Sequence, residues 1–306
     1  YRQAKKRSHR NRYPGMAATV HKVCECNKRE ALDRYNREKL MADLFNKNAR
    51  EAVEAMVQKP EFSKEALEAE YRKLEAEGFP DGDRIRFISA LGNSGEIAYH
   101  YQLICKDWEE ETQLFLENSF DCHGEEGLKF LWEKLRKMEE QEKRKRAFTA
   151  YLMAVCLSKL KHRTFYTSYC DCLAVFLTEL LEKEGEAFLR SKLIIALGWV
   201  GSSKEIEVLI KQMQYDSDAL CRAWSATSLM QMSFHRVNKA VLQEKIRADF
   251  ARAILEEKDA YTCGLILESA QTIFGKKWIT SSAIENIELE KIEKAKKSAL
   301  RFLHTK

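Results

Sequence analysis

The stretch from Leu189 to Met213 constrains the fold more than any other part of the sequence. It reads LRSKLIIALGWVGSSKEIEVLIKQM, two apolar helical segments that follow each other across a short turn. Apolar residues at intervals of three and four give each helix one hydrophobic face, which a single helix cannot bury by itself. Paired helices bury these faces against each other, and stacked pairs share one continuous core. The stretch therefore predicts helical hairpins in series.

The placement of proline extends this prediction over most of the chain. Pro14, Pro60 and Pro80 are the only prolines, and residues 81–306 have none. A proline inside a helix removes a hydrogen bond and clashes with the preceding turn, so its absence favours an uninterrupted run of helices. Gly78, just before Pro80 in GFPDGD, adds a helix stop signal and marks an internal boundary.

The predicted fold class is all-α, with about six antiparallel helix hairpins stacked as a solenoid. We expect residues 16–78 to form extra N-terminal helices that pack on the first repeat, and residues 80–306 to form the repeat array. One continuous helix from about Ser282 to Leu303 is predicted to close the array. It has an apolar side and a charged side, and a terminal repeat needs such a polar outer face.

An arginine recurs in the first helix of several hairpins. Arg84 and Arg190 are followed six to eight residues later by Ala-Leu-Gly, ending at Gly92 and Gly198, and Arg222 is followed at the same offsets by Ser-Leu-Met. Small residues at these offsets let neighbouring helices approach closely, and we expect the two glycines to end their helices. The spacing from Arg190 to Arg222 matches one helical hairpin.

The segment 187–233, which contains LRSKLIIALGWVG and LCRAWSATSLMQM, resembles a HEAT repeat. It is close to the short bacterial kind found in phycobilisome-lyase-like repeats. The resemblance is partial at 83–97, degenerate between the two segments, and absent from 1–78. It implies a right-handed α-solenoid in which the second helix of each hairpin lines a concave face. It does not imply lyase activity, because these repeats occur in many unrelated binding proteins.

Cysteine usage indicates a reducing compartment. The chain has nine cysteines, an odd number, and several lie inside helical apolar patterns: Cys105, Cys156, Cys221 and Cys263. A buried free cysteine behaves as a small hydrophobic residue, whereas disulfide frameworks belong to oxidising compartments. We therefore expect a cytoplasmic protein.

Residues 1–15 form a basic tail. They contain six Lys or Arg and no acid, while the whole chain has a net charge of +5, so the remainder is close to neutral. A block of Lys and Arg is typical of the cytoplasmic flank of a membrane span. We expect either a disordered tail or a juxtamembrane segment, and in the second case a transmembrane helix that precedes Tyr1 and anchors the protein at the inner face of the plasma membrane. Contact with a membrane is expected only through that preceding segment.

Potential metal ligands occur in three short groups: His21 with Cys24 and Cys26, Cys122 with His123, and Cys170 with Cys172. On a helix, the two thiols of a Cys-x-Cys pair point about 200° apart, which is poor geometry for one ion. None of the seven histidines precedes a glutamate, so the His-Glu dyads of the HEAT-like deoxyhypusine hydroxylases are missing. We expect no metal and no cofactor, and a metalloenzyme is the least favoured alternative.

Catalytic residues are not predicted. The sequence has no GxSxG motif, and the GNSGE turn at Gly92–Glu96 lacks the longer glycine-lysine run and preceding strand of a phosphate-binding loop. The favoured function is a monomeric, non-catalytic scaffold that binds a protein or a peptide. The expected binding residues lie on the second helices: Tyr166, Tyr169, Lys204, Lys211 and Arg247.

Two questions stay open at this point. Helical solenoids of the DNA-alkylation-repeat kind bind nucleic acid, but the predicted second helices mix charges of both signs, as in Lys204 and Glu205, which is typical of a solvated face. Aromatic residues such as Trp199, Trp224 and Trp278 either anchor a partner or pack between layers, and packing is favoured because large aromatic side chains dominate cores.

Overall fold

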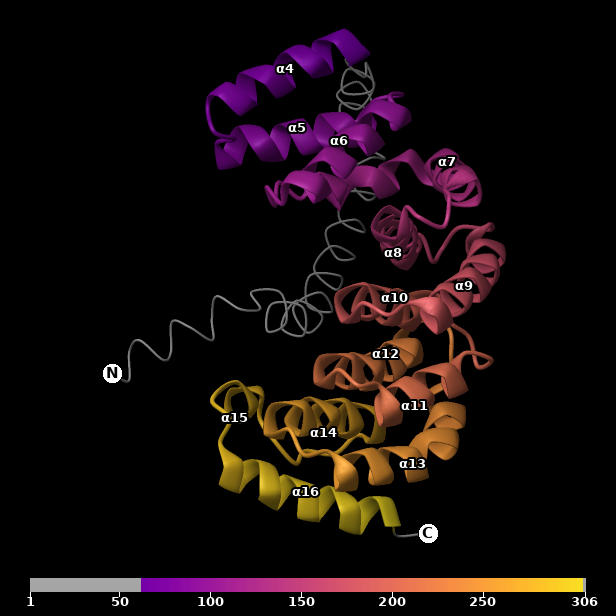
Figure 1. Ribbon diagram of the computed structural model, residues 1–306, viewed down its shortest axis with the longest axis vertical. Coiled ribbons are helices and arrows are strands. Elements are labelled where there is room, and N and C mark those ends of the chain that lie inside the picture. Colours follow the sequence, from indigo (N-terminus) through magenta and orange to yellow (C-terminus); the bar gives the residue numbers. More distant parts are fainter. Residues whose placement is uncertain (1–61, 305–306) are drawn as a thin grey trace, which may run out of the picture. The chain divides into compact units, whose positions relative to one another are not determined.

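The computed structural model describes residues 62–304, and these residues form helices and no β-strand (Figure 1). The chain divides into two units, Tyr1–Glu61 and Phe62–Lys306. The predictions for residues 1–15, and for the part of 16–78 that precedes Phe62, lie outside the described residues, as do those for His21, Cys24 and Cys26. The all-helical class predicted from the sequence is confirmed for the described range.

The helices follow one another at short intervals. The first seven elements are α4 (Lys64–Ala76), α5 (Asp81–Asn93), α6 (Ile97–Glu110), the 3-10 helix η1 (Leu116–His123), α7 (Gly124–Lys137), α8 (Lys143–Lys159) and α9 (Tyr166–Lys183). The remaining seven are α10 (Ala187–Val200), α11 (Ile206–Tyr215), α12 (Ala219–His235), α13 (Lys239–Glu256), α14 (Ala260–Phe274), α15 (Ser281–Glu285) and α16 (Leu289–His304).

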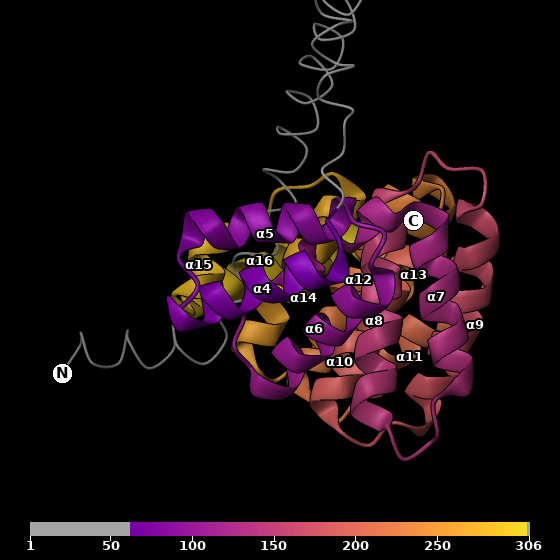
Figure 2. The same ribbon diagram turned by 90° about the horizontal axis from the view of Figure 1, so that it is seen from above.

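Helix α4 begins after Ser63, whose hydroxyl accepts a hydrogen bond from the Ala66 amide. Helix α4 packs on α5, and α5 packs on η1. In Figure 2, α5 runs across the direction of α7 and α9. The first helices of the described unit are thus arranged differently from those that follow.

The sequence between α6 and α7 does not continue as an α-helix. The backbone takes left-handed conformations at Glu111, Gln113 and Phe115 and then forms η1. The cause is the buried carboxylate of Asp107, which accepts hydrogen bonds from the Thr112 hydroxyl at 2.6 Å and from the Leu114 and Phe115 amides at 2.9 and 3.1 Å. One side chain therefore organises this turn.

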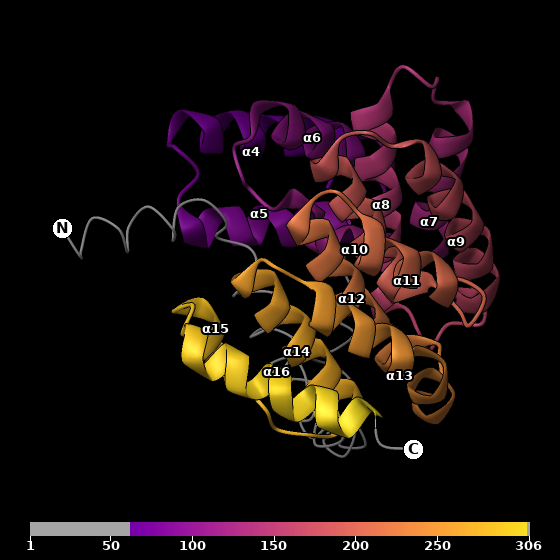
Figure 3. The ribbon, with the colours of Figure 1, turned by 60° about the horizontal axis from the view of Figure 1, so that its bottom comes forward.

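From α8 onward the helices form two rows (Figures 1 and 3). Helices α8, α10, α12 and α14 make the first row, in which each helix contacts the next. Helices α9, α11 and α13 lie beside them, with α9 packed on α8 and α10, and α11 on α12 and α13. Leu197, Leu209 and Phe250 are fully buried among these helices. The apolar faces identified in the sequence thus form the core.

Gly92 and Gly198 do not terminate their helices by a left-handed turn, so that prediction is wrong. Helix α10 continues two residues past Gly198, and Gly92 lies within α5. Both positions require glycine because of close packing. A Cβ on Gly92 would lie 2.6 Å from the Cβ of Ser119, and one on Gly198 would lie 2.8 Å from the Cα of Ser228.

The serines at these two contacts make the same hydrogen bond. The Ser228 hydroxyl donates to the Ile194 carbonyl at 2.9 Å, and the Ser119 hydroxyl donates to the Ile88 carbonyl. In both cases the carbonyl lies four residues before the glycine. The close approach therefore places a hydroxyl where it satisfies the backbone of the neighbouring helix.

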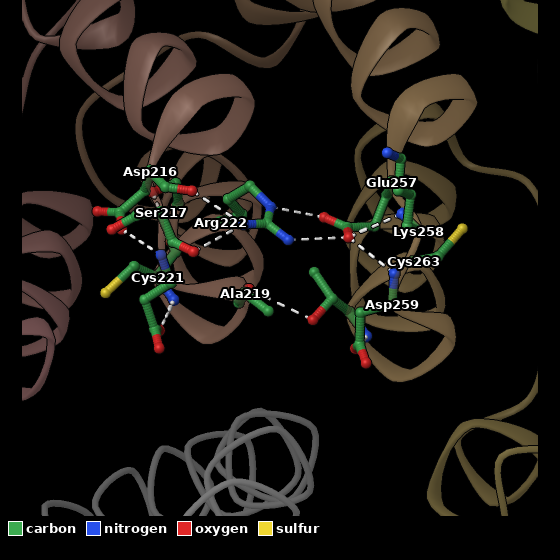
Figure 4. Close-up of polar contacts among 12 residues, drawn as sticks. Asp216, Ser217, Ala219, Cys221, Arg222, Glu257, Lys258, Asp259 and Cys263 are labelled. Atoms are coloured by element: carbon green, nitrogen blue, oxygen red, sulfur yellow. Dashed lines mark hydrogen bonds and ion pairs between the residues drawn. The ribbon is translucent and has the colours of Figure 1, made fainter.

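Arg190 and Arg222 form bidentate ion pairs with carboxylates that precede the next helix of the first row. Arg190 donates to Asp216 at 2.7 and 2.9 Å, and Arg222 donates to Glu257 at 2.7 and 2.9 Å. The Asp216 and Glu257 side chains are 2% and 3% exposed. Arg222 also donates to the Asp216 carbonyl at 2.9 Å, so the two pairs are linked (Figure 4).

Arg84 of α5 and Arg144 of α8 make different contacts. Arg84 pairs with the exposed Asp81 three residues before it, at 2.8 Å. Arg144 pairs with the exposed Glu111, also at 2.8 Å. The recurring arginine of the sequence therefore has two structural roles.

The C-terminal helix predicted from Ser282 to Leu303 is two helices, α15 and α16. The chain breaks between them at Ile287, whose φ is 50°. Helix α16 packs on α13 and α14 with its apolar side, while its charged side is exposed. It is therefore placed where a capping helix is expected, although it is shorter than predicted.

Candidate functional site

The structure places the two predicted tyrosines differently. Tyr166, the first residue of α9, is 7% exposed, and its buried hydroxyl has no hydrogen-bond partner among residues 62–304. Burial raises the pKa of this phenol above its ordinary value. Tyr169 is half-buried and packs edge-on against Phe165, with ring centroids 5.9 Å apart. Tyr166 thus belongs to the interior, and we leave it out of the candidate surface.

The three predicted cations lie on different elements. Lys204 precedes α11 and Lys211 lies on it, and both are exposed. Arg247 of α13 lies over the rings of Phe274 and Phe302, at 5.2 and 4.9 Å from their centroids, and donates to the Phe302 carbonyl. Arg247 therefore helps to hold α16 against the array.

A cluster of aromatic side chains brings together three helices that the sequence analysis did not connect. The rings of Trp108 and Phe148 are 5.0 Å apart, and those of Phe148 and Phe188 are 5.9 Å apart. Tyr151 and Trp199 extend the group, with centroids separated by 5.4 Å. We call these five residues of α6, α8 and α10 the aromatic cluster.

The Lys192 ammonium lies over three rings of this cluster. Its Nζ is 4.8 Å from the Tyr151 centroid, 5.5 Å from that of Phe188 and 5.8 Å from that of Phe148. Each distance is within the range of a cation–π interaction. A second cation, Arg144, lies 5.6 Å from the Phe148 centroid, so the cluster combines aromatic rings with two positive charges.

Burial perturbs the ionisable groups around Lys192. It lowers the pKa of Lys192, against the opposing effect of the Glu117 carboxylate, and it raises the pKa of Glu117. Burial also raises the pKa of Tyr151 to about 12, an effect to which Glu117 adds. Phe188, in contrast, is 48% exposed. Ionisable groups shifted by burial beside an exposed ring are features of a binding site.

The three tryptophans for which the sequence allowed either a binding or a packing role are intermediate in exposure. Trp199 belongs to the aromatic cluster, Trp224 lies on α12, and Trp278 packs against Phe302 with centroids 5.8 Å apart. Trp199 and Trp278 therefore contribute to packing, and all three tryptophans are only partly exposed.

The cysteines lie where the helical pattern predicts. The four expected in apolar faces are buried: Cys105, Cys156, Cys221 and Cys263. On α9, Cys170 is buried and Cys172 is exposed, which confirms that a Cys-x-Cys pair on a helix points in two directions. Within residues 62–304, no three His, Cys, Asp or Glu side chains come together as ligands for one metal ion.

A histidine pair joins α6 to η1. His100 Nε2 donates to the Leu116 carbonyl at 2.8 Å, and His100 Nδ1 is 2.9 Å from His123 Nε2. Burial lowers the pKa of both rings to about 4. Both are therefore neutral at pH 7, which suits a hydrogen-bonded pair inside the fold.

Comparison with models of protein families, with curated proteins and with solved structures finds no match to this chain. Every helix in residues 62–304 is too short or too polar to span a bilayer.

Proposed function

We propose that this chain is a non-catalytic scaffold that binds a protein or a peptide through the aromatic cluster. Its two rows of helices are interpreted as successive hairpins of a right-handed, HEAT-like α-solenoid. Two observations support this interpretation. Each helix of the first row contacts the next, and a buried arginine–carboxylate pair recurs before α12 and before α14. Solenoids present extended surfaces, which makes binding the natural role for such an array.

The exposure of Phe188 beside other rings is the observation that carries the binding proposal. Phe188 is 48% exposed and contacts Phe148, which in turn contacts Trp108. Phe148 is buried, so Phe188 is the exposed end of this aromatic group, and exposed aromatic side chains are frequent anchors of protein interfaces. The proposed surface lies on α8 and α10, the first helices of their hairpins. The resemblance to HEAT repeats had pointed to the second helices instead.

Nucleic-acid binding is less favoured because three cations of α8 and α10 form ion pairs with carboxylates of this chain. Arg144 pairs with Glu111, Lys159 with Asp121 at 2.7 Å, and Arg190 with Asp216. Binding to phosphates requires an excess of available Lys and Arg.

Selection of random short peptides displayed on phage, with the whole chain as bait, tests the proposal. We expect enriched peptides whose affinity falls by about tenfold or more in Phe188→Ser, because an aromatic anchor contributes more than about 1.4 kcal/mol. The matched control is Tyr215→Ser, since Tyr215 is a 66% exposed ring on α11. Peptides that bind both variants equally, or no enrichment at all, would overturn the proposal.

A further inference from the structure

Lys192 lies over three aromatic rings, whereas Lys106, Lys134 and Lys276 each lie over one. Lys106 lies 4.9 Å from the Tyr71 centroid, but its ammonium also pairs with Glu75 at 2.8 Å. Lys192 faces three rings, and no carboxylate in the part of the chain that the structure describes lies within ion-pair distance of its Nζ. The three rings attract the Lys192 ammonium through their π-electrons, but they offer it no oxygen or nitrogen atom as a hydrogen-bond acceptor. Within residues 62–304 this half-buried ammonium donates no hydrogen bond, so its N–H groups have no acceptor in the described unit.

The surroundings make this charge a strong anchor. Three rings hold the side chain in place, so little conformational freedom is lost when an acceptor binds. The site is also partly withdrawn from water, and a charge-assisted hydrogen bond is stronger where the local dielectric is low. The exposed ring of Phe188 lies next to the ammonium and offers apolar contact to whatever brings that acceptor.

We propose that Lys192 binds a carboxylate of an acidic peptide segment, while an apolar side chain next to that carboxylate packs on Phe188. This inference rests on the proposed function, because it names the partner of the same surface. The charge of the ammonium selects a negatively charged group, and the adjoining rings select a peptide with an apolar residue beside the acid.

Glu117 opposes this binding and so provides an independent test. Its charge acts on Lys192, and it would also repel an incoming carboxylate. Removing the Glu117 charge should therefore tighten the binding of an acidic peptide. If the surface bound a basic peptide instead, Glu117 would be the anchor and its removal would weaken binding.

The experiment uses peptides recovered from the phage selection, synthesised with and without their acids and titrated into the whole chain. We expect the enriched peptides to pair Asp or Glu with an apolar neighbour. Lys192→Met should weaken their binding by about tenfold or more, as expected for loss of a hydrogen bond to a charged group. Lys192→Arg should retain most of the affinity, and Glu117→Gln should tighten binding. Lys245→Met, which alters an exposed lysine on α13, should change nothing.

The outcomes separate the two proposals. This inference would be overturned, and the proposed function would stand, if the peptides that lose binding to Phe188→Ser are basic or neutral. The same holds if those peptides bind Lys192→Met as tightly as the unaltered chain. Failure to enrich any peptide, or peptides insensitive to Phe188→Ser, would overturn both. Circular dichroism of each variant shows that a loss of binding is not a loss of folding.

Discussion

The helices before α8 and those from α10 to α14 share one packing contact and differ in another. A glycine of one helix meets a serine of a neighbouring element in both regions, at Gly92 with Ser119 and at Gly198 with Ser228. The arginine that precedes each glycine pairs with a buried carboxylate only in the second region. Close helix approach therefore does not depend on the ion pair, and the ion pair is an additional constraint on successive helices of the regular rows.

The irregular segment between α6 and α7 explains why the first region lacks that constraint. The place of a full helix is taken by η1, and a histidine pair and the Asp107 carboxylate organise the backbone there. The turn that would present a buried acid to Arg84 is not formed. In this region the histidine pair and the Asp107 hydrogen bonds are present, and the buried arginine–carboxylate pair is not.

Replacing a buried arginine should lower the free energy of unfolding more than altering the glycine, histidine or serine contacts. Arg222→Leu leaves the Glu257 carboxylate buried without its cation, and we expect the free energy of unfolding to fall by about 3 kcal/mol. Arg144→Leu breaks an exposed pair and should cost less than about 1 kcal/mol. Urea denaturation of both variants measures the difference. Equal losses would show that burial of an arginine–carboxylate pair does not increase its contribution to stability.

The glycine contact should be costly to alter in both regions. Gly92→Ala and Gly198→Ala each force a Cβ to within 3 Å of a serine, and overpacking of this kind costs about 1–3 kcal/mol. Gly82→Ala is the matched control, because Gly82 also lies in α5 but a Cβ there would meet nothing within 4 Å. The control should be neutral or stabilising by up to about 1 kcal/mol, from helix propensity. A destabilised control would contradict the packing explanation.

The histidine pair should make the first region sensitive to acid. His100 has a pKa of about 4 in the folded chain and an ordinary value of 6.5, so the unfolded chain binds more protons between these values. Stability contributed by neutral His100 is complete above pH 6.5 and is lost as the pH falls towards 4. His100→Gln should reduce the slope of unfolding free energy against pH in this window by up to about 1.4 kcal/mol per pH unit. Urea titrations from pH 4.5 to pH 7 measure that slope, and the exposed His162→Gln should leave it unchanged.

Removing the serine hydroxyls should change the free energy of unfolding least, and by a similar amount in the two regions. Ser119→Ala and Ser228→Ala each remove one hydrogen bond to a backbone carbonyl, at an expected cost of about 1 kcal/mol. Thermal denaturation of the two variants side by side provides the comparison. If one serine cost several times more than the other, the two contacts would not be equivalent.

Helix positions could be predicted from the sequence because hydrophobic periodicity sets them. Helices α4, α10, α12 and α14 lie where their apolar residues recur at three and four, and Ser63 caps α4 as its residue type suggests. The path from Glu111 to His123 could not be predicted, because a buried carboxylate that accepts bonds from residues five to eight positions later leaves no periodic signal.

The aromatic cluster escaped prediction for a related reason. Trp108, Phe148 and Phe188 are each separated by 40 residues, and only the packing of α6, α8 and α10 brings them to Lys192. In the sequence, nothing distinguishes any one of these residues from an ordinary core or surface residue. The role of Gly198 was likewise hidden, since a glycine near a helix end suggests a stop, and its serine neighbour lies in the next helix of the row.

A double-mutant cycle on Arg222 and Glu257 tests most directly whether buried pairs tie successive helices together. The free energies of unfolding of Arg222→Leu, Glu257→Leu and the double variant give the coupling between the two side chains. We predict a coupling above about 2 kcal/mol, against less than about 0.5 kcal/mol for the exposed pair of Arg144 and Glu111. A coupling for Arg222 and Glu257 as small as that of the exposed pair would contradict the account.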